Sequence, residues 1–332
     1  MYFSIITVLI QIVLVSNDKS DCGCNINNER DDHLWKSSNE ESSTKCSSRD
    51  NGKCFYNEND LNENMVIIPE GLYQMGTDDI VIENDKEGPM KMVKVKSFYM
   101  DKYEVSNTDF MRYAKATDYK TEAEIFGDSF VFSLFLNNTF REQLKDFRVV
   151  QAPWWYKVLG ANWKHPQGPD SDILDLMEHP VVHVSWRDAK GYCKWRGARL
   201  PTEEEWEAAC RGGHNNTLFP WGDKLLPNKK YMANIWQGTF PNHNSVKDGY
   251  IGTNPVQMFV ANDFGLYNMA GNVWEWVENG WSNDNPQDKV KKGGSYLCHK
   301  SYCYRYRCSA RSHNTEDSSS GNLGFRCAKS IA

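Results

Sequence analysis

The pattern of hydrophobic and polar positions divides the chain into three parts. Residues 1–16 form an apolar run, and a polar segment rich in Asn, Asp, Glu and Ser follows it. Hydrophobic and aromatic residues recur from about residue 64, and no later stretch has the ~20 consecutive apolar residues of a membrane span. We therefore predict a signal peptide over 1–20, a flexible segment over 21–63 and a single folded domain over 64–332.

Local patterns in the folded part predict short strands and three capped helices. Residues 66–76 and 92–96 have the short apolar or alternating runs that are typical of strands. Ser106, Ser185 and Thr202 each precede apolar residues at helical spacing, and side chains of this kind cap helix N-termini. Each of the three is therefore predicted to begin a helix.

The stretches between these elements are long and have little periodicity. The second and third helices are predicted to end near Gly197 and at Gly212, because glycine readily adopts the left-handed conformation that ends a helix. Residues 120–180 and 213–295 are too long for ordinary loops. We expect ions, disulfides or aromatic packing, and not regular strand ladders, to hold them in place.

Composition agrees with an irregular fold. Of the 332 residues, 40% are hydrophobic and 13% aromatic, with 12 Trp among them. A chain with few aliphatic and many aromatic residues is expected to form a loop-rich domain around large rings and not a helical bundle. The net charge of −6 provides no general attraction for phosphate backbones, which argues against a dedicated nucleic-acid binder.

Three features indicate an oxidising compartment. They are the apolar N-terminal run, the ten cysteines, and N-glycosylation sequons at Asn137 and Asn215. The run lacks a charged n-region, so a signal anchor is the alternative to a cleaved signal peptide. The C-terminus has no KDEL-type signal, so retention in the endoplasmic reticulum would require another protein.

Four cysteines of the folded part are candidates for structural disulfides. Cys193 and Cys210 lie on the apolar faces of predicted helices, and Cys308 and Cys327 in the C-terminal segment are natural partners for them. Such bridges would close loops of about 100 residues or more, and each would contribute up to roughly 4–5 kcal/mol in the chain-entropy model.

Cys298 and Cys303 form a separate pair, with four residues between them. The pair can be a small-loop disulfide, a reduced dithiol or a site for a soft metal ion. Four basic residues nearby would favour the thiolate form: His299, Lys300, Arg305 and Arg307.

The remaining four cysteines lie in the polar N-terminal segment. Cys22 and Cys24 suit thiol–disulfide exchange with a partner protein, and an incidental local bridge is the alternative. Cys46 and Cys54 can close a small loop of their own.

Longer strings resemble the formylglycine-generating enzymes, the sulfatase-modifying factor family of the endoplasmic reticulum. The similarity covers roughly residues 64–329, and the following strings carry it: Phe126–Phe132, His183–Trp186, Arg199–Glu203, Ala233–Gly238 and Gly324–Cys327. The resemblance implies an α+β fold of the C-type-lectin-like variant, with little regular secondary structure and bound Ca²⁺. It also implies a protein of the endoplasmic-reticulum lumen, with a fraction secreted.

The activity implied by this resemblance is oxidation of the cysteine in a C-x-P-x-R segment of unfolded sulfatases to Cα-formylglycine, with O₂ and a reducing thiol. Cys298 and Cys303 match the family's Cu(I) ligands, and two thiolates suit this soft ion. The substrate thiol would be the third ligand. Trp274 and Tyr302 match walls of the active site. Four more residues match side chains that line it: Ser295, His299, Arg311 and Asn322. The hydroxyl and amide would donate hydrogen bonds, and the histidine and arginine would hold the negative charge of the thiolates.

Two calcium sites and two disulfides carry over by the same matching. The first calcium site takes the side chains of Asn234 and Asp248 and the carbonyls of Ile235 and Tyr250. The second takes the side chains of Asn268 and Glu275 and the carbonyls of Gly271 and Val273. The implied disulfides are Cys193–Cys327 and Cys210–Cys308. Mixed carboxylate, amide and carbonyl oxygens are the ligands that Ca²⁺ prefers. In this family the Cys-Gly-Cys pair, here Cys22 and Cys24, contributes to contact with retention proteins or thiol oxidoreductases.

Three other functions compete with this interpretation. A non-catalytic paralogue that binds sulfatases lacks the cysteine pair that this chain keeps at 298 and 303. A sugar-binding module would need open positions on its Ca²⁺, whereas the ligands here come from the protein. The iron-dependent sulfoxide synthases carry an additional His-rich domain, and this chain has eight His and no such segment.

Overall fold

The computed structural model describes residues 64–282 and 284–331. The predicted signal peptide, the segment 21–63 and its four cysteines lie outside these residues, and so their predictions stay open. Within the described part, every helix is too short or too polar to cross a lipid bilayer.

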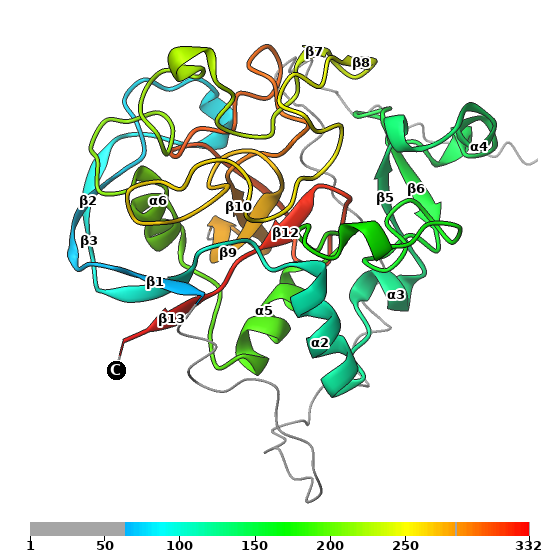
Figure 1. Ribbon diagram of the computed structural model, residues 1–332, viewed down its shortest axis with the longest axis horizontal. Coiled ribbons are helices and arrows are strands. Elements are labelled where there is room, and N and C mark those ends of the chain that lie inside the picture. The colour runs from blue at the N-terminus through cyan, green and yellow to red at the C-terminus, as the bar shows by residue number, and fades with distance from the viewer. Residues whose placement is uncertain (1–63, 283, 332) are drawn as a thin grey trace, which may run out of the picture.

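A four-stranded sheet occupies the middle of the molecule (Figure 1). Its strand order is β11 (Arg311–Thr315), β10 (Asn285–Lys292), β9 (Trp274–Ser282) and β12 (Leu323–Phe325). Strand β10 runs antiparallel to both of its neighbours, whereas β12 runs parallel to β9. All four strands lie between residues 274 and 325, near the C-terminal end of the chain.

Shorter ladders surround this sheet. One three-stranded antiparallel sheet joins both ends of the domain, in the order β1 (Met65–Ile68), β4 (Phe98–Asp101) and β13 (Ala328–Ser330). Three two-stranded ladders complete the set: β2 (Gly71–Met75) with β3 (Lys91–Val95), β5 (Asp128–Phe132) with β6 (Trp155–Leu159), and β7 (Gly238–Thr239) with β8 (His243–Asn244). The predicted strands at 66–76 and 92–96 are therefore confirmed as β1, β2 and β3.

The three predicted helix starts are also confirmed. The described helices are α2 (Asn107–Thr117), α3 (Glu122–Phe126), α4 (Asn138–Gln143), α5 (Trp186–Trp195) and α6 (Glu203–Arg211). Ser106 caps α2, Ser185 caps α5 and Thr202 caps α6, each through its side-chain oxygen. The caps of α5 and α6 are full capping boxes, which satisfy two backbone donors at once. Helix α6 ends at Gly212, whose φ of 62° is left-handed, as predicted.

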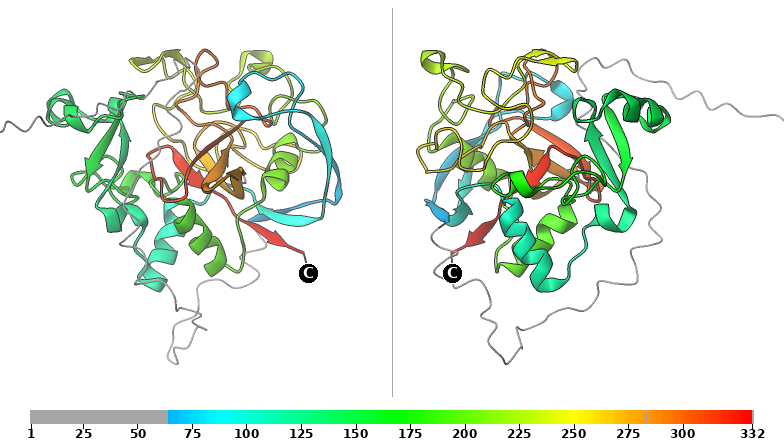
Figure 2. Two further views of the ribbon diagram at one scale, coloured as in Figure 1. Left: turned by 180° about the vertical axis from the view of Figure 1, so that it is seen from behind. Right: turned by 45° about the vertical axis from the view of Figure 1, so that its right-hand side comes forward.

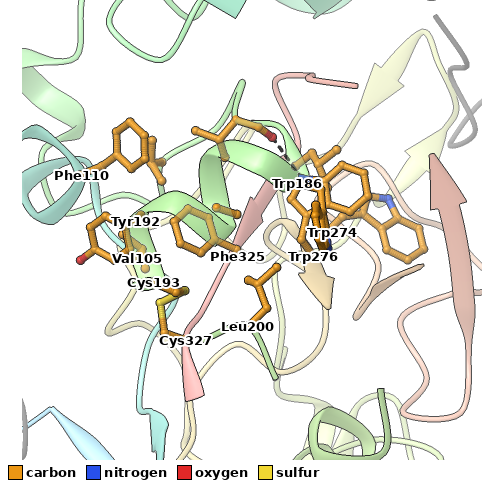
Figure 3. Packing of buried hydrophobic residues seen from close by; sticks show 14 of the residues in the cluster. Val105, Phe110, Trp186, Tyr192, Cys193, Leu200, Trp274, Trp276, Phe325 and Cys327 are labelled. Atoms are coloured by element: carbon orange, nitrogen blue, oxygen red, sulfur yellow. Dashed lines mark hydrogen bonds between the residues drawn. A yellow bond between two sulfur atoms is a disulfide. The ribbon is translucent and has the colours of Figure 1, made fainter. Parts of the chain in front are cut away.

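Helix α5 packs against the central sheet through aromatic residues (Figure 3). Trp186 at its start donates its indole hydrogen to the Val277 carbonyl of β9, and Trp276 of β9 donates to the Val184 carbonyl. Both Trp276 and Trp274 are completely buried. Aromatic side chains thus supply much of the core, in agreement with the composition.

Two disulfides tie helices to the C-terminal segment. Cys193 of α5 is bonded to Cys327, and Cys210 of α6 to Cys308. The bridges span 134 and 98 positions of the sequence. Both pairings agree with those implied by the resemblance, and both connect a helix to the C-terminal segment of the chain.

The expectation that residues 213–295 and 120–180 are held without regular strand ladders is wrong. In 213–295, β9 and β10 pair within the central sheet. The stretch 120–180 also contains a ladder. Strands β5 and β6 pair there over five residues each, and lie at the edge of the molecule in all three views (Figures 1 and 2). Every residue of β5 is buried, so the strand lacks the alternation that would reveal it. The expected aromatic packing is present: Phe132, Trp155 and Trp236 share one buried cluster.

Candidate active site

Cys298 and Cys303 meet in a tight turn between strands β10 and β11 of the central sheet. Their sulfur atoms are 2.6 Å apart and both side chains are fully buried. This separation is shorter than an ordinary contact between sulfur atoms and longer than the ~2.05 Å of a disulfide bond. The other four cysteines in the described part of the chain are oxidised, whereas these two are thiols.

Backbone hydrogen bonds bring the two thiols together. The His299 carbonyl accepts from the backbone nitrogen of Cys303 at 2.7 Å, which closes the turn. On the other side, the backbone nitrogen of Cys298 donates to the Ser295 carbonyl at 2.9 Å. Gly294 precedes this turn with φ of 68°, and a Cβ there would lie 3.0 Å from the backbone nitrogen of Tyr306. The close approach of two backbone segments therefore requires glycine at this position.

Ser295 and Asn322 lie beside the sulfur of Cys298, as the resemblance implied. The Asn322 amide donates to Ser295 Oγ at 2.9 Å, and the Leu297 backbone nitrogen donates to the same oxygen at 3.3 Å. A serine oxygen has two acceptor positions, and both are then used. The hydroxyl hydrogen is left to donate to the Cys298 sulfur, and the Ser295 backbone nitrogen also points at this sulfur at 3.4 Å.

The two thiols differ in acidity. Burial acts to raise the pKa of Cys298, but hydrogen bonds from Cys303 and Ser295 and the charge of Arg305 outweigh it and lower this pKa below the usual thiol value. Burial, and donation of its proton to Cys298, raise the pKa of Cys303 well above that value. Of the two, Cys298 is therefore the more acidic thiol.

The His299 and Arg311 side chains have polar partners other than the two sulfurs. The Arg311 guanidinium makes a bidentate ion pair with Glu203, at 2.8 and 2.9 Å, and lies 4.4 Å from the Trp281 ring. The His299 ring is partly exposed and its Nδ1 is 2.8 Å from Ser301 Oγ. Burial and the neighbouring Lys300 charge lower the pKa of His299, which favours a neutral ring.

The predicted walls are aromatic and in part exposed. Tyr302 stacks on Phe240 with ring centroids 4.0 Å apart, and its hydroxyl donates to the Leu297 carbonyl. Trp274 is fully buried, and its backbone nitrogen donates to the Asn322 carbonyl at 2.8 Å. Phe240 is an additional member of this wall, and it lies in a stretch whose lack of periodicity concealed it from sequence reasoning.

Comparison with known proteins gives the family. The sulfatase-modifying factor enzyme 1-like domain matches residues 51–331. The chain belongs to the formylglycine-generating enzyme family. It is 57% identical over 277 residues to the formylglycine-generating enzyme of Mus musculus, covering 80% of this chain and 74% of that protein. It is 48% identical to that of Thermomonospora curvata, covering 81% and 94%.

Two further similarities bear on function and fold. An inactive Cα-formylglycine-generating enzyme 2 of Bos taurus is 46% identical, covering 80% of this chain and 87% of that protein. The solved structure of PvdO from Pseudomonas aeruginosa is 25% identical, with a TM-score of 0.57, covering 80% of this chain and 94% of that one. The expected α+β family fold with little helix is therefore confirmed.

The first set of residues that match calcium ligands in this family lies close together. The Asp248 carboxylate accepts the backbone nitrogens of Ile235 and Tyr250, both at 3.1 Å. Among the described residues, Asn234 Oδ1 is buried and has no hydrogen-bond partner. The half-buried Asp248 carboxylate and the unsatisfied amide oxygen of Asn234 are ligands of the kind that fits a hard cation such as Ca²⁺.

The second set fits in part. Asn268 Oδ1 is likewise buried without a hydrogen-bond partner in the described part of the chain. Glu275, however, accepts from Arg326 with both oxygens, at 2.7 Å each, and from the Trp206 indole at 2.7 Å. A carboxylate has about four acceptor positions, so one remains for a cation. A second buried carboxylate, Glu104, accepts from the Asn268 amide at 3.1 Å. Glu104 has polar neighbours in the sequence, and so the sequence did not indicate that it is buried beside Asn268.

The two sequon asparagines are exposed. Asn137 caps α4 by accepting from the Phe140 backbone nitrogen at 2.8 Å, and Asn215 lies in the turn after α6. Both positions are accessible to a modifying enzyme, and glycosylation at them stays a prediction.

Proposed function

We propose that this chain is an active formylglycine-generating enzyme, which oxidises the cysteine of a C-x-P-x-R segment in unfolded sulfatases to Cα-formylglycine. The observation that carries this proposal is the pair of buried thiols at Cys298 and Cys303, 2.6 Å apart in a domain whose other described cysteines form disulfides. The relatives named formylglycine-generating enzyme, at 48–57% identity, support it.

The reaction requires electrons from two sources. The substrate cysteine gives up two electrons and its sulfur, which leaves as H₂S, and gains one oxygen as the aldehyde. The reducing thiols give up two more electrons and become a disulfide. Together these four electrons reduce O₂. In the overall balance, one of its two oxygen atoms is found in a water molecule and the other accounts for the aldehyde oxygen. The atoms and electrons balance with one O₂ and two reducing thiols for each formylglycine.

Cys298 and Cys303 would hold a Cu(I) ion, with the substrate thiol as the third ligand. When bound, Cu(I) supplies a soft centre that binds thiolates and can pass an electron to O₂. Ser295 donates its hydroxyl hydrogen to the Cys298 sulfur and so favours the thiolate that a metal needs. Both cysteines are fully buried, whereas the neighbouring Tyr302 and His299 are partly exposed, so we expect the substrate to approach from their side.

A non-catalytic sulfatase-binding protein is the alternative function. The 46% identity to an inactive relative gives it weight, because overall similarity does not separate the two classes. The cysteine pair is the feature that we expect to separate them, since the resemblance implies that a non-catalytic paralogue lacks it. We therefore favour the enzyme.

We further propose two bound Ca²⁺ ions, at the Asn234–Asp248 and Asn268–Glu275 sets, and glycans on Asn137 and Asn215. The protein would act in the lumen of the endoplasmic reticulum, with a fraction secreted. Cys22 and Cys24 would exchange disulfides with thiol oxidoreductases or retention proteins there. The sequence features that support these proposals are the N-terminal apolar run, the sequons and the ten cysteines.

Mass spectrometry of a C-x-P-x-R peptide tests the function. The peptide is incubated with the protein, Cu(I), O₂ and a thiol, and we expect it to lose H₂S and gain one oxygen. Cys298→Ser and Cys303→Ser should each abolish this change while the melting temperature stays near that of the unaltered protein. Turnover by either variant would contradict the proposed centre, and no turnover by the unaltered protein would favour the binding protein.

A further inference from the structure

The side-chain amide of Asn234 is bonded at its nitrogen but not at its oxygen, among the residues that the structure describes. Its two amide hydrogens are donated to the Gly252 carbonyl at 2.7 Å and to Asn272 Oδ1 at 3.3 Å. Both partners are acceptors, so the amide cannot turn end for end without leaving them unpaired. Its Oδ1, buried and without a partner in this part of the chain, is therefore held in one direction.

Asn268 repeats this arrangement in the second set of calcium ligands. Its two amide hydrogens are donated to Glu104 Oε2 and to the Val256 carbonyl, both at 3.1 Å. A carboxylate and a carbonyl accept and do not donate, so this amide is also fixed. The Asn268 Oδ1 is likewise buried without a hydrogen-bond partner in the described part of the chain. Each set thus contains one ligand oxygen whose direction is determined by acceptors at the neighbouring nitrogen.

Asn272 connects the two amides. Its Nδ2 donates to Glu104 Oε1 at 2.8 Å, and its Oδ1 accepts from Asn234 and from the Asn254 backbone nitrogen at 2.9 Å. Glu104 therefore accepts from Asn272 with one oxygen and from Asn268 with the other. Four side chains, each at most 7% exposed, form a continuous line from one unpartnered oxygen to the other.

The backbone holds Asn272 at the same place. The residue lies between Gly271 and Val273, whose carbonyls match ligands of the second calcium site. Its backbone nitrogen donates to the Asn234 carbonyl at 2.8 Å, and its carbonyl accepts from the Tyr296 backbone nitrogen at 2.9 Å. A Cβ on Gly271 would lie 2.3 Å from the Asn234 carbonyl oxygen, so this close approach requires glycine. Asn272 is therefore fixed before any ion arrives.

The doubly bonded nitrogen separates these two ligand asparagines from other buried ones. Asn107 and Asn254 also have a buried Oδ1 without a partner in the described residues, but each amide nitrogen there makes a single hydrogen bond. Their amide planes are less constrained. A buried oxygen without a partner costs the folded protein free energy, which a bound cation can offset. Asn234 and Asn268 are built so that only their oxygens are available to such an ion.

We propose that Glu104 and Asn272 are positioning residues for both calcium sites, and that the two sites weaken together when this link is broken. The inference rests on the calcium sites of the proposed function. Neither side chain belongs to the ligand sets that the resemblance implies, so the link acts through Asn234 and Asn268. Partners that orient a metal ligand typically contribute about 10- to 100-fold to affinity.

Calorimetric titration of chelator-treated protein with Ca²⁺ tests this inference. Asp248→Asn weakens the first site and so reports the second, and Asn268→Gly reports the first. Asn272→Gly, added to each, removes the link without changing the charge. Glycine suits both asparagines, because their φ values are 53° and 57°. We expect Asn272→Gly to lower Ca²⁺ affinity about 10- to 100-fold at both sites.

The matched control is Asn262→Gly. Asn262 is also buried, but its amide is fully bonded: the nitrogen donates to two carbonyls and the oxygen accepts from two backbone nitrogens. Both variants should lower the melting temperature in chelator, which reports their structural roles. Asn262→Gly should change Ca²⁺ affinity by no more than about twofold at either site. Equal weakening by the two variants, or weakening at one site only in Asn272→Gly, would overturn the inference.

The outcomes separate the link from the calcium sites themselves. If the unaltered protein binds no Ca²⁺, the sites are wrong and the inference fails with them. Two bound ions and an unchanged affinity in Asn272→Gly would remove the inference alone.

Should Asn272→Gly not fold, Glu104→Gln keeps the backbone and the shape of the side chain. A carboxamide has one acceptor oxygen for the two amide donors of Asn268 and Asn272, so one of these amides must turn. The Ca²⁺ affinity of at least one site should then fall about 10- to 100-fold. Unchanged affinity at both sites would contradict the positioning role.

Discussion

At the level of single residues, the thiol chemistry depends on where one hydroxyl hydrogen points. Ser295 has both acceptor positions filled, by Asn322 and Leu297, so its hydrogen turns to the Cys298 sulfur. The orientation of the Asn322 amide is set in turn by Ser320, whose hydroxyl donates to Asn322 Oδ1 at 2.9 Å. Ser320 is thus a positioning residue at the start of a line of donors that ends at the Cys298 sulfur.

Ser320→Ala should lower turnover without unfolding the protein. Loss of one neutral hydrogen bond corresponds to a roughly three- to tenfold effect, and we expect this decrease in kcat for a C-x-P-x-R peptide, with little change in KM. Ser318→Ala is the control, because this serine is also buried but bonds to Thr315. An equal decrease in both variants would show that Ser320 acts only through packing of the turn.

At the level of elements, His183 joins strand β5 to two irregular segments. The residue is completely buried with φ of 59°, its Nδ1 is 2.8 Å from Ser129 Oγ of β5, and its Nε2 is 2.9 Å from the Pro166 carbonyl. The backbone nitrogen of His183 donates to the Ser320 carbonyl at 3.0 Å. One neutral ring therefore helps to place both the hairpin and the active-site turn.

The protonation of His183 should make stability depend on pH. Burial lowers the pKa of His183 from 6.5 to about 4, so between these values the unfolded chain binds a proton that the folded one does not. Stability is then complete above pH 6.5 and is lost as the pH falls toward 4, by roughly 2 kcal/mol at pH 5.

Chemical denaturation at several pH values measures this loss. Burial raises the pKa of Asp188 to about 7, so protonation of this carboxyl stabilises the folded protein as the pH falls. This opposing effect is present in the unaltered protein and in the variant alike, so the slope of stability against pH is compared between the two. His183→Asn keeps a side chain that tolerates positive φ, and its stability should fall less steeply between pH 7 and pH 5. Parallel slopes in the two proteins would contradict this account.

At the level of the whole molecule, links far apart in the sequence replace a large regular sheet. Two disulfides span 134 and 98 positions, and the ion pairs of Asp85 and Glu87 span 220. The segment 213–273 has only the two-residue strands β7 and β8. The unsatisfied oxygens of Asn234 and Asn268 lie in this same segment, which suits stabilisation by bound Ca²⁺.

Removal of Ca²⁺ should therefore lower the melting temperature. At calcium concentrations about 100-fold above Kd, each site contributes about 2.7 kcal/mol, which corresponds to a shift of roughly 5–10 °C for a domain of this size. Calorimetry with and without a chelator measures the shift. In Asp248→Asn, which weakens the first site, the chelator should have a smaller effect. An unchanged melting temperature after long equilibration with chelator would argue against both sites.

Helix starts and ends follow from the sequence alone, because the caps act within a few residues. Ser185 and Thr202 accept from backbone nitrogens three positions on, and Gly212 ends α6 by its own conformation. The thiol pair is also readable, since a turn of five positions brings Cys298 and Cys303 together. Family membership, carried by long strings, supplied the disulfide pairing.

Tertiary structure alone decided which charged and aromatic groups serve the site. Four basic residues lie close to the thiols in sequence, yet Arg305 and Arg307 are paired with Asp85 and Glu87, 220 positions earlier in the chain. Glu275 matches a calcium ligand, but Arg326 and Trp206 take most of its acceptor positions. Strand β5 was concealed because both of its faces are buried. Local patterns report local hydrogen bonds, whereas burial and charge compensation depend on segments that meet only when the chain has folded.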